Sequence, residues 1–261
     1  MSVQAVRVSP DWLILREPAD AAARSAGLAE RLARHLPASG RLVIHDLGGG
    51  SGAMGRWLAP RLRGAQHWVV HDRDAGLLEL AVAAPPASVT LEARCSDITA
   101  LTPDDLAGAS LVTGSALLDL LTADELARML RACTGLPMLL ALNVVGRVAL
   151  TPPDPLDTAM AAAFDAHQRR DGLLGPDAAG VAVEELRETG AEVLVRPSPW
   201  HLGAADAGLA AEWLEGWVGA ACEQQPALAA DAGEYRDRRL AQLAAGQLAV
   251  TVGHADLLVL P

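Results

Sequence analysis

A glycine-rich turn after a short apolar run is the feature that most constrains this chain. Residues 42–47 read Leu-Val-Ile-His-Asp-Leu, and residues 48–52 read Gly-Gly-Gly-Ser-Gly. An apolar run of this length that ends at glycines is typical of a buried strand. Glycines let the backbone approach a ligand closely, and the helix that we expect at residues 53–62 offers free N–H groups at its start. The segment therefore predicts a strand, a ligand-binding turn and a helix, in that order.

The rest of the chain continues this alternation of strands and helices. Further strands are expected at residues 67–71, 88–93, 110–113, 138–144, 191–196 and 255–260. Further helices are expected at residues 20–36, 75–82, 123–134, 156–169, 182–189, 206–223 and 235–245. Strands that alternate with helices at this spacing favour an α/β fold with a parallel, doubly wound sheet.

Composition and charge restrict the partners of the chain. The 261 residues are 51% hydrophobic, which is enough for one sizeable core in a single domain over residues 1–261. The net charge is −11, so we expect no nucleic acid and no membrane as partner, since both favour basic patches. All 21 basic residues are arginine, which excludes a lysine Schiff base and a lysine general base. We expect a monomer or a homodimer.

Cysteine usage and the N-terminal segment indicate the compartment. Cys95, Cys133 and Cys222 are far apart in the sequence, as expected for free thiols in a reducing cytoplasm and not for a disulfide framework or a metal site. The N-terminus lacks a charged region followed by an apolar block, and no apolar run reaches the length of a membrane span. We therefore expect a cytoplasmic protein without a bound metal.

Asp46 and the glycines after it resemble the first motif of the class I S-adenosylmethionine-dependent methyltransferases, written acid-x-Gly-x-Gly-x-Gly. A carboxylate at this strand tip would repel a pyrophosphate, whereas it would accept a hydrogen bond from an ammonium or hydroxyl group. The resemblance covers roughly residues 41–145 and, loosely, the C-terminal strand. It implies a Rossmann-like sheet of seven mostly parallel strands with an antiparallel C-terminal strand, and S-adenosyl-L-methionine as the cofactor.

The ends of the later strands supply further expected cofactor contacts, because ligands of open parallel sheets bind there. Asp72 ends the second strand, and its separation along the sequence from the glycines is about that of an acid that binds both ribose hydroxyls. An aspartate that only forms a turn could stand at the same position. The resemblance implies that Asp97 accepts from the adenine amino group and that Ile98 packs on the ring. The complete expected cofactor set is Asp46, Gly48, Gly50, Gly52, Asp72, Arg73, Asp97, Ile98, Ser115 and Arg16.

The methyl acceptor is expected to be a small molecule. Residues 113–119 depart completely from the Asn/Asp-Pro-Pro-aromatic motif of methyltransferases that act on base or amide nitrogens. An N-terminal helical lid at residues 1–38 and a helical insertion at residues 147–190 would enclose the acceptor. An oxygen or carbon nucleophile often needs a general base, most often histidine. His167 and His201 are therefore the candidate catalytic residues, and the acceptor atom stays open.

Two other functions fit the same glycines. Residues 50–55 form a literal G-x-G-x-x-G, a weak signal for a dinucleotide site, so an NAD(P)-dependent oxidoreductase is one alternative. Asp46 weakens it, because the pyrophosphate of a dinucleotide meets only N–H groups. The lack of lysine weakens it further, since a Tyr-Lys proton relay is impossible. A module that keeps the fold but transfers no methyl group is the other alternative.

Several side chains have a structural interpretation beside the functional one. Arg16 and Arg24 are expected either to clamp a carboxylate or to pair with neighbouring acids. Asp119 is either an acid at a helix start or a base for the acceptor. His167 and His201 are bases or ordinary surface histidines.

Overall fold

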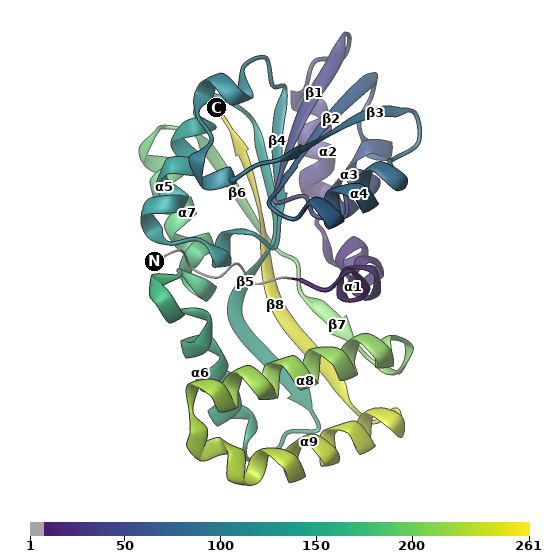
Figure 1. Ribbon diagram of the computed structural model, residues 1–261, viewed down its shortest axis with the longest axis vertical. Coiled ribbons are helices and arrows are strands. Elements are labelled where there is room, and N and C mark those ends of the chain that lie inside the picture. Colours follow the sequence, from purple (N-terminus) through teal and green to yellow (C-terminus); the bar gives the residue numbers. More distant parts are fainter. Residues whose placement is uncertain (1–7) are drawn as a thin grey trace.

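The computed structural model describes residues 8–261, which fold around one sheet of eight strands (Figure 1). The strand order is β3-β2-β1-β4-β5-β8-β6, and β7 pairs with β8. Strands β1 to β5 pair in parallel, whereas β8 is antiparallel to β5, β6 and β7. The strands are β1 Arg41–Leu47, β2 Ala65–Asp72, β3 Val89–Cys95, β4 Leu111–Ser115, β5 Met138–Thr151, β6 Glu192–Pro197, β7 Trp200–Leu202 and β8 Ala249–Leu260. The doubly wound α/β sheet with an antiparallel C-terminal strand is confirmed.

The sheet has one strand more than the seven expected, and the additional strand is β7. It spans only three residues, too few to produce a periodic pattern in the sequence. Trp200 and Leu202 are buried while His201 between them is exposed, because successive side chains of a strand point to opposite faces.

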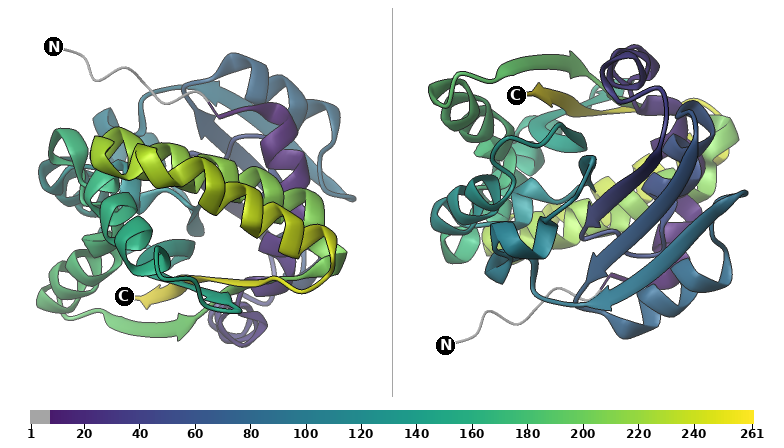
Figure 2. Two further views of the ribbon diagram at one scale, coloured as in Figure 1. Left: turned by 90° about the horizontal axis from the view of Figure 1, so that it is seen from below. Right: turned by 90° about the horizontal axis from the view of Figure 1, so that it is seen from above.

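Helices cover both faces of the sheet (Figure 2). One face carries α2 (Ala26–His35), α3 (Ala53–Leu58) and α4 (Ala75–Ala83), and the other carries α5 (Ala123–Ala132) and α7 (Ala178–Glu188). Ile44 and Trp68 belong to the core of the first face, and Leu47 and Leu126 to that of the second. Neighbouring residues of the central strands thus point into two separate cores, which explains why these strands read as continuous apolar runs.

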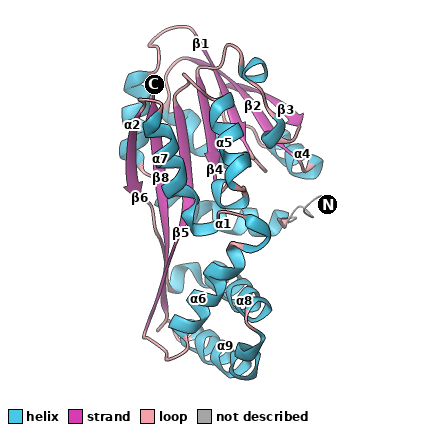
Figure 3. Cartoon of the chain, turned by 90° about the vertical axis from the view of Figure 1, so that its left-hand side faces the viewer, coloured by secondary structure: helices cyan, strands magenta, loops and turns pink. Residues whose placement is uncertain are grey.

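Strands β5 and β8 continue beyond the sheet as a long antiparallel ribbon, and three helices pack on it (Figure 3). These helices, which we call the helical layer, are α6 (Asp157–Gln168), α8 (Ala207–Gln224) and α9 (Ala229–Ala244). Buried Arg239 of α9 pairs with Asp157 of α6 at 2.5 Å, and Tyr235 donates to the same carboxylate at 2.7 Å. Of the segment 147–190, α6 lies in this layer and α7 packs on the sheet. No helix within residues 8–261 has the length and apolarity needed to cross a membrane.

The N-terminal part forms two helices where one was expected at residues 20–36. These are α1 (Pro10–Ala23) and α2, and residues 1–7 of the expected lid lie outside the described residues. The chain breaks at Arg24 and Ser25, because the Ser25 hydroxyl caps α2 and the Ser25 N–H donates to Asp256 at 2.7 Å. Figure 1 shows α1 beside the ends of the parallel strands.

Candidate functional site

The glycine loop (residues 48–52) follows β1 at the edge where β1 to β4 end, which we call the carboxyl edge. Gly48, Gly50 and Gly52 have φ angles of +61°, +52° and +83°, in the left-handed region that favours glycine. Gly49 is required for a different reason, since a Cβ atom there would lie 2.6 Å from Asp46 Oδ2. The loop backbone therefore packs directly on the tip of β1, where no side chain fits.

Asp46 is fully buried at the head of the glycine loop. Thr113 donates a hydrogen bond of 2.7 Å to its Oδ1, while its Oδ2 has no partner within residues 8–261. Burial raises the pKa of Asp46 from 3.8 to about 6, against the opposite effects of the Thr113 hydrogen bond and the Arg24 charge. A buried, half-satisfied carboxylate costs free energy. The site therefore fits a ligand that brings a hydrogen-bond donor or a positive charge to Oδ2.

Arg24 places a buried cation at the same edge. Its side chain is 1% exposed, and its Nη2 lies 3.0 Å from Ser115 Oγ and 3.9 Å from Asp20 Oδ2. Its Nε and Nη1 are buried and without a hydrogen-bond partner in the described part of the chain. Desolvation lowers the pKa of Arg24, whereas the nearby charges of Asp20 and Asp46 raise it. The carboxyl edge thus holds a buried anion, Asp46, and a buried cation, Arg24, each with unused hydrogen-bonding atoms.

The expected ribose and adenine residues lie at the ends of β2 and β3. Asp72 accepts a hydrogen bond of 2.9 Å from the Gly50 N–H, which ties the glycine loop to β2. Asp97 pairs with Arg73 at 2.5 Å, and both side chains are about half exposed. Ile98 is buried in the same core as Leu47 and Leu126. A carboxylate has about four lone-pair sites, so both acids keep capacity for a ligand hydroxyl or amino group.

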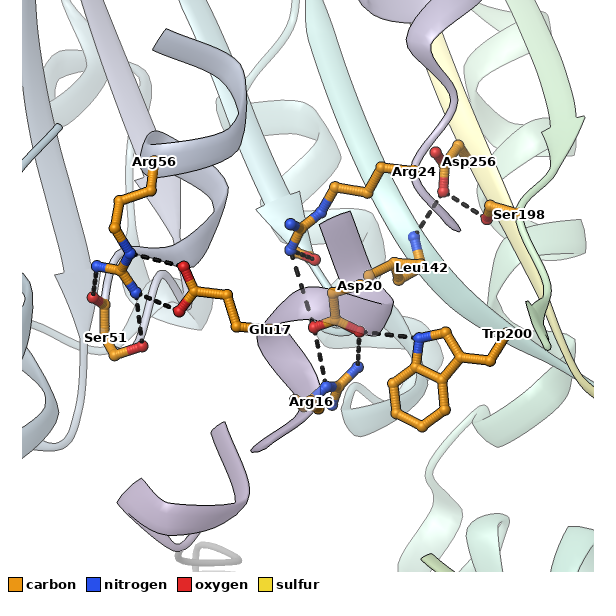
Figure 4. A network of polar contacts seen from close by, with 11 residues as sticks. Arg16, Glu17, Asp20, Arg24, Ser51, Arg56, Leu142, Ser198, Trp200 and Asp256 are labelled. Carbon is orange, nitrogen blue, oxygen red and sulfur yellow. Dashed lines mark hydrogen bonds and ion pairs between the residues drawn. The ribbon is translucent and has the colours of Figure 1, made fainter. Parts of the chain in front are cut away.

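Helix α1 is tied to both sides of the carboxyl edge (Figure 4). Glu17 forms a bidentate pair with Arg56 of α3, at 2.6 and 2.7 Å. Arg16 forms a bidentate pair with Asp20, at 2.9 and 3.2 Å, and its guanidinium lies 4.9 Å from the ring centre of Trp200. The Trp200 indole also donates to Asp20 at 3.0 Å. Arg16 was expected either to clamp a ligand carboxylate or to pair with a neighbouring acid, and the structure contains the pair, with Asp20.

The two histidines proposed as bases lie apart from the glycine loop. His167 on α6 has its Nε2 3.1 Å from Glu223 on α8 and its Nδ1 3.0 Å from Arg170. His201 on β7 is exposed and contacts Thr251 of β8 at 3.3 Å. The structure therefore brings together Asp46, the glycines, Asp72 and Ser115. Neither His167 nor His201 forms a hydrogen bond with any of these residues in the described part of the chain.

Two further titratable groups lie close to Arg16. Asp119, four residues after Ser115, has a buried Oδ1 without a partner among the described residues, and burial raises its pKa to about 6. The His254 ring lies 5.2 Å from Trp200, and burial together with the charge of Arg16 lowers its pKa to about 4. Asp119 was expected to be either an acid at a helix start or a base for the acceptor, whereas His254 was not among the expected site residues. The position of Asp119 after the fourth strand indicated that it could belong to the site, whereas no pattern in the sequence indicated His254.

Comparison with solved structures identifies the fold. Cyclopropane synthase MmaA2 from Mycobacterium tuberculosis is 14% identical, with a TM-score of 0.51, over 97% of this chain and 94% of that chain. The YcgJ protein from Bacillus subtilis is 11% identical, also with a TM-score of 0.51, over 90% of this chain and 97% of that chain. No protein-family model and no curated protein matches the chain. The strand order and these neighbours give the chain the fold of the class I methyltransferases.

Proposed function

We propose that this protein binds S-adenosylmethionine and transfers its methyl group to a small-molecule acceptor. The observation that carries the proposal is the buried Asp46 carboxylate at the head of the glycine loop, whose Oδ2 has no partner in the described chain. A pyrophosphate placed on this loop would meet an uncompensated negative charge. The ammonium group of S-adenosylmethionine would instead neutralise it and supply the missing donor. This electrostatic argument favours the methyltransferase over the NAD(P)-dependent oxidoreductase.

The remaining predicted contacts follow from the strand ends. Asp72 would accept from the ribose hydroxyls, while Asp97 would accept from the adenine amino group above Ile98. Arg73 would hold Asp97 in place through the pair that it already forms. When bound, the cofactor supplies a methyl group on a positively charged sulfur, so the protein chiefly has to align the nucleophile and exclude water.

Helix α1 supports a closed site above the glycine loop. Leu13 of α1 lies 3.5 Å from the position of a Cβ atom on Gly50, and the Glu17–Arg56 pair fixes the helix to α3. We therefore keep the expectation that the N-terminal helices act as a lid, with the acceptor between this lid and the helical layer. In this arrangement Asp119 is better placed than His167 or His201 to take a proton from the acceptor, because it follows β4 at the carboxyl edge.

Calorimetry with S-adenosylhomocysteine and NAD tests the cofactor assignment. We expect S-adenosylhomocysteine to bind and NAD to give no heat, and we expect Asp72→Ala to weaken binding about tenfold, or about 1.4 kcal/mol. Asp104→Ala, an exposed acid outside the carboxyl edge, is the matched control and should bind like the wild type. Binding of NAD alone would overturn the proposal.

Transfer is tested separately from binding. The protein is incubated with methyl-labelled S-adenosylmethionine and a small-molecule fraction of a cell lysate, and labelled products are separated by chromatography. A labelled metabolite that needs the protein supports an enzyme. Binding of the cofactor without any labelled product would favour the module that keeps the fold but transfers nothing.

A further inference from the structure

Asp119 is a carboxylate that none of the proposed cofactor contacts uses. It lies between β4 and α5, and its Oδ1 is buried without a hydrogen-bond partner within residues 8–261. A buried carboxylate oxygen that receives no hydrogen bond costs free energy. The position of Asp119 therefore calls for a ligand group that donates a hydrogen bond.

The segment between β4 and α5 borders the glycine loop, and so does helix α1. Leu117 of this segment lies 2.8 Å from the position of a Cβ atom on Gly48, and Leu13 of α1 lies 3.5 Å from the position of a Cβ atom on Gly50. Arg16 follows Leu13 by three positions, which puts both on the same side of α1. Both segments thus place side chains beside the loop that is proposed to hold the cofactor.

Arg16 brings a cation with a free donor close to Asp119. Its Nε and Nη2 donate to Asp20, whereas its Nη1 forms no hydrogen bond in the described part of the chain. Burial raises the pKa of Asp119 and the nearby charge of Arg16 lowers it, so the guanidinium lies near this carboxylate. The ion pair of Arg16 is nevertheless with Asp20. An N–H donor and a carboxylate oxygen, each without a partner among the described residues, therefore lie near each other at the carboxyl edge.

A hydroxyl group matches this donor and this acceptor better than the other methyl acceptors do. It has one hydrogen to donate to Asp119 and two lone pairs, of which one accepts from Arg16 and the other stays free to attack the methyl group. A neutral amine has a single lone pair, so it could not accept from Arg16 and attack at the same time. A carboxylate has no hydrogen for Asp119 and would be repelled by its charge.

We propose that the methyl acceptor is a hydroxyl compound and that Asp119 is the catalytic residue that takes its proton. The inference rests on the proposed function and adds to it the acceptor atom and the base. A lone pair of the hydroxyl oxygen forms the new O–CH₃ bond while the electron pair of the S–CH₃ bond returns to sulfur, and the hydroxyl proton passes to the ionised Asp119 carboxylate. The free Arg16 N–H stabilises the negative charge that develops on the oxygen. The products are a methyl ether, S-adenosylhomocysteine and protonated Asp119.

His254 is the rival base, because it is also buried near Arg16. Its Nδ1 has no partner in the described chain, and burial together with the charge of Arg16 lowers its pKa to about 4. Burial instead raises the pKa of Asp119 to about 6. The carboxylate is thus the stronger base of the two at neutral pH, and a comparison of the two residues decides between them.

The first experiment identifies the atom that receives the methyl group. The wild-type protein is incubated with S-adenosylmethionine carrying a ¹³C-labelled methyl group and with the small-molecule fraction of a cell lysate. The ¹³C shift of the labelled product separates a methyl group on oxygen from one on nitrogen or carbon, and mild alkali releases it from an ester but not from an ether. We expect an alkali-stable O-methyl group. This measurement needs no variant, so it holds even if a substitution prevents folding.

Three variants assign the base. Asp119→Asn keeps the size of the side chain and removes the base, so we expect it to slow formation of this product at least about 100-fold. Its affinity for S-adenosylhomocysteine should change less than about threefold, since Asp119 is not a proposed cofactor contact. His254→Asn should stay within about tenfold of the wild-type rate. Asp104→Asn, an exposed acid outside the carboxyl edge, is the matched control and should react like the wild type, and thermal unfolding verifies that each variant is folded.

The outcomes separate this inference from the proposed function. A labelled methyl group on nitrogen or carbon, or one that mild alkali releases, overturns the hydroxyl acceptor and leaves the methyltransferase in place. A folded Asp119→Asn variant that reacts within about tenfold of the wild type overturns the assignment of the base, as does a loss confined to His254→Asn. If the wild type gives no labelled product, the proposed transfer itself fails, and this inference fails with it.

Discussion

Replacing Asp46 by asparagine should make the protein without its ligand more stable at neutral pH. The Asp46 carboxylate is completely buried, and its Oδ2 has no partner in the described chain. Asparagine has nearly the same shape and keeps the oxygen that accepts from Thr113. It removes the charge that burial penalises, so the folded state no longer carries the cost of ionisation.

The size of the effect follows from the pKa of Asp46, which burial raises from 3.8 to about 6. The folded state binds the proton more tightly than the unfolded state, so the free energy of unfolding falls as the pH rises from about 4 to about 6. Ionisation therefore costs about 3 kcal/mol at pH 7.5 and about half of that at pH 5. An unpaired amide N–H in the variant costs about 1–2 kcal/mol in return. We expect Asp46→Asn to be about 1–2 kcal/mol more stable than the wild type at pH 7.5 and about equally stable at pH 5.

Urea denaturation followed by circular dichroism at pH 7.5 and at pH 5 measures this difference. Asp74→Asn is the matched control, because Asp74 caps α4 at the same edge and asparagine is an equally good cap. The reasoning would be refuted by a variant no more stable than the wild type at pH 7.5, or by a difference that does not change with pH. Binding of S-adenosylhomocysteine should weaken in the same variant, since the ammonium loses its counter-charge.

Two ion pairs give the remaining predictions. Glu17→Gln should loosen α1, because it removes one charge of the bidentate pair with Arg56, and should cost about 1 kcal/mol. Hydrogen exchange of the α1 amides should become faster, and unchanged exchange would contradict the role of this pair. Asp157→Asn should cost about 3–5 kcal/mol in urea denaturation, because it leaves the buried Arg239 cation without its acid. Adding Arg239→Met should recover part of this loss, and a cost below about 1 kcal/mol for the single variant would count against the argument.

Most of the sheet could be predicted because its signals are local. The apolar runs of β1, β2 and β5 and the glycines at 48–52 are readable in a short window of sequence. The extension of β5 beyond residue 144 could not be predicted from a short window, because residues 145–151 become a strand only through pairing with β8. The break between α1 and α2 was missed for a similar reason, since it depends on Asp256, 231 positions further along the chain.

The candidate site likewise contains residues that the sequence could place and residues that it could not. The placement of Asp46 and Asp72 follows from strand ends and a motif, so the sequence was enough to put them at the carboxyl edge. The burial and missing partners of Arg24 depend on elements far away in the sequence, and composition or spacing cannot show them. The exposure of His201 was not readable either, because it follows from β7, whose three residues produce no periodic pattern in the sequence.

The contact between Ser25 and Asp256 also has a consequence for how the protein is made. A chain emerging from the ribosome can build the glycine loop, β2 and most helices before β8 exists. The backbone of Ser25, next to Arg24, gains this contact only when Asp256 joins the sheet between β5 and β6, among the last steps of a fold rich in contacts between distant residues. A form that lacks β8 therefore has the glycine loop without this contact beside it, and the arrangement of the carboxyl edge is completed only together with the fold.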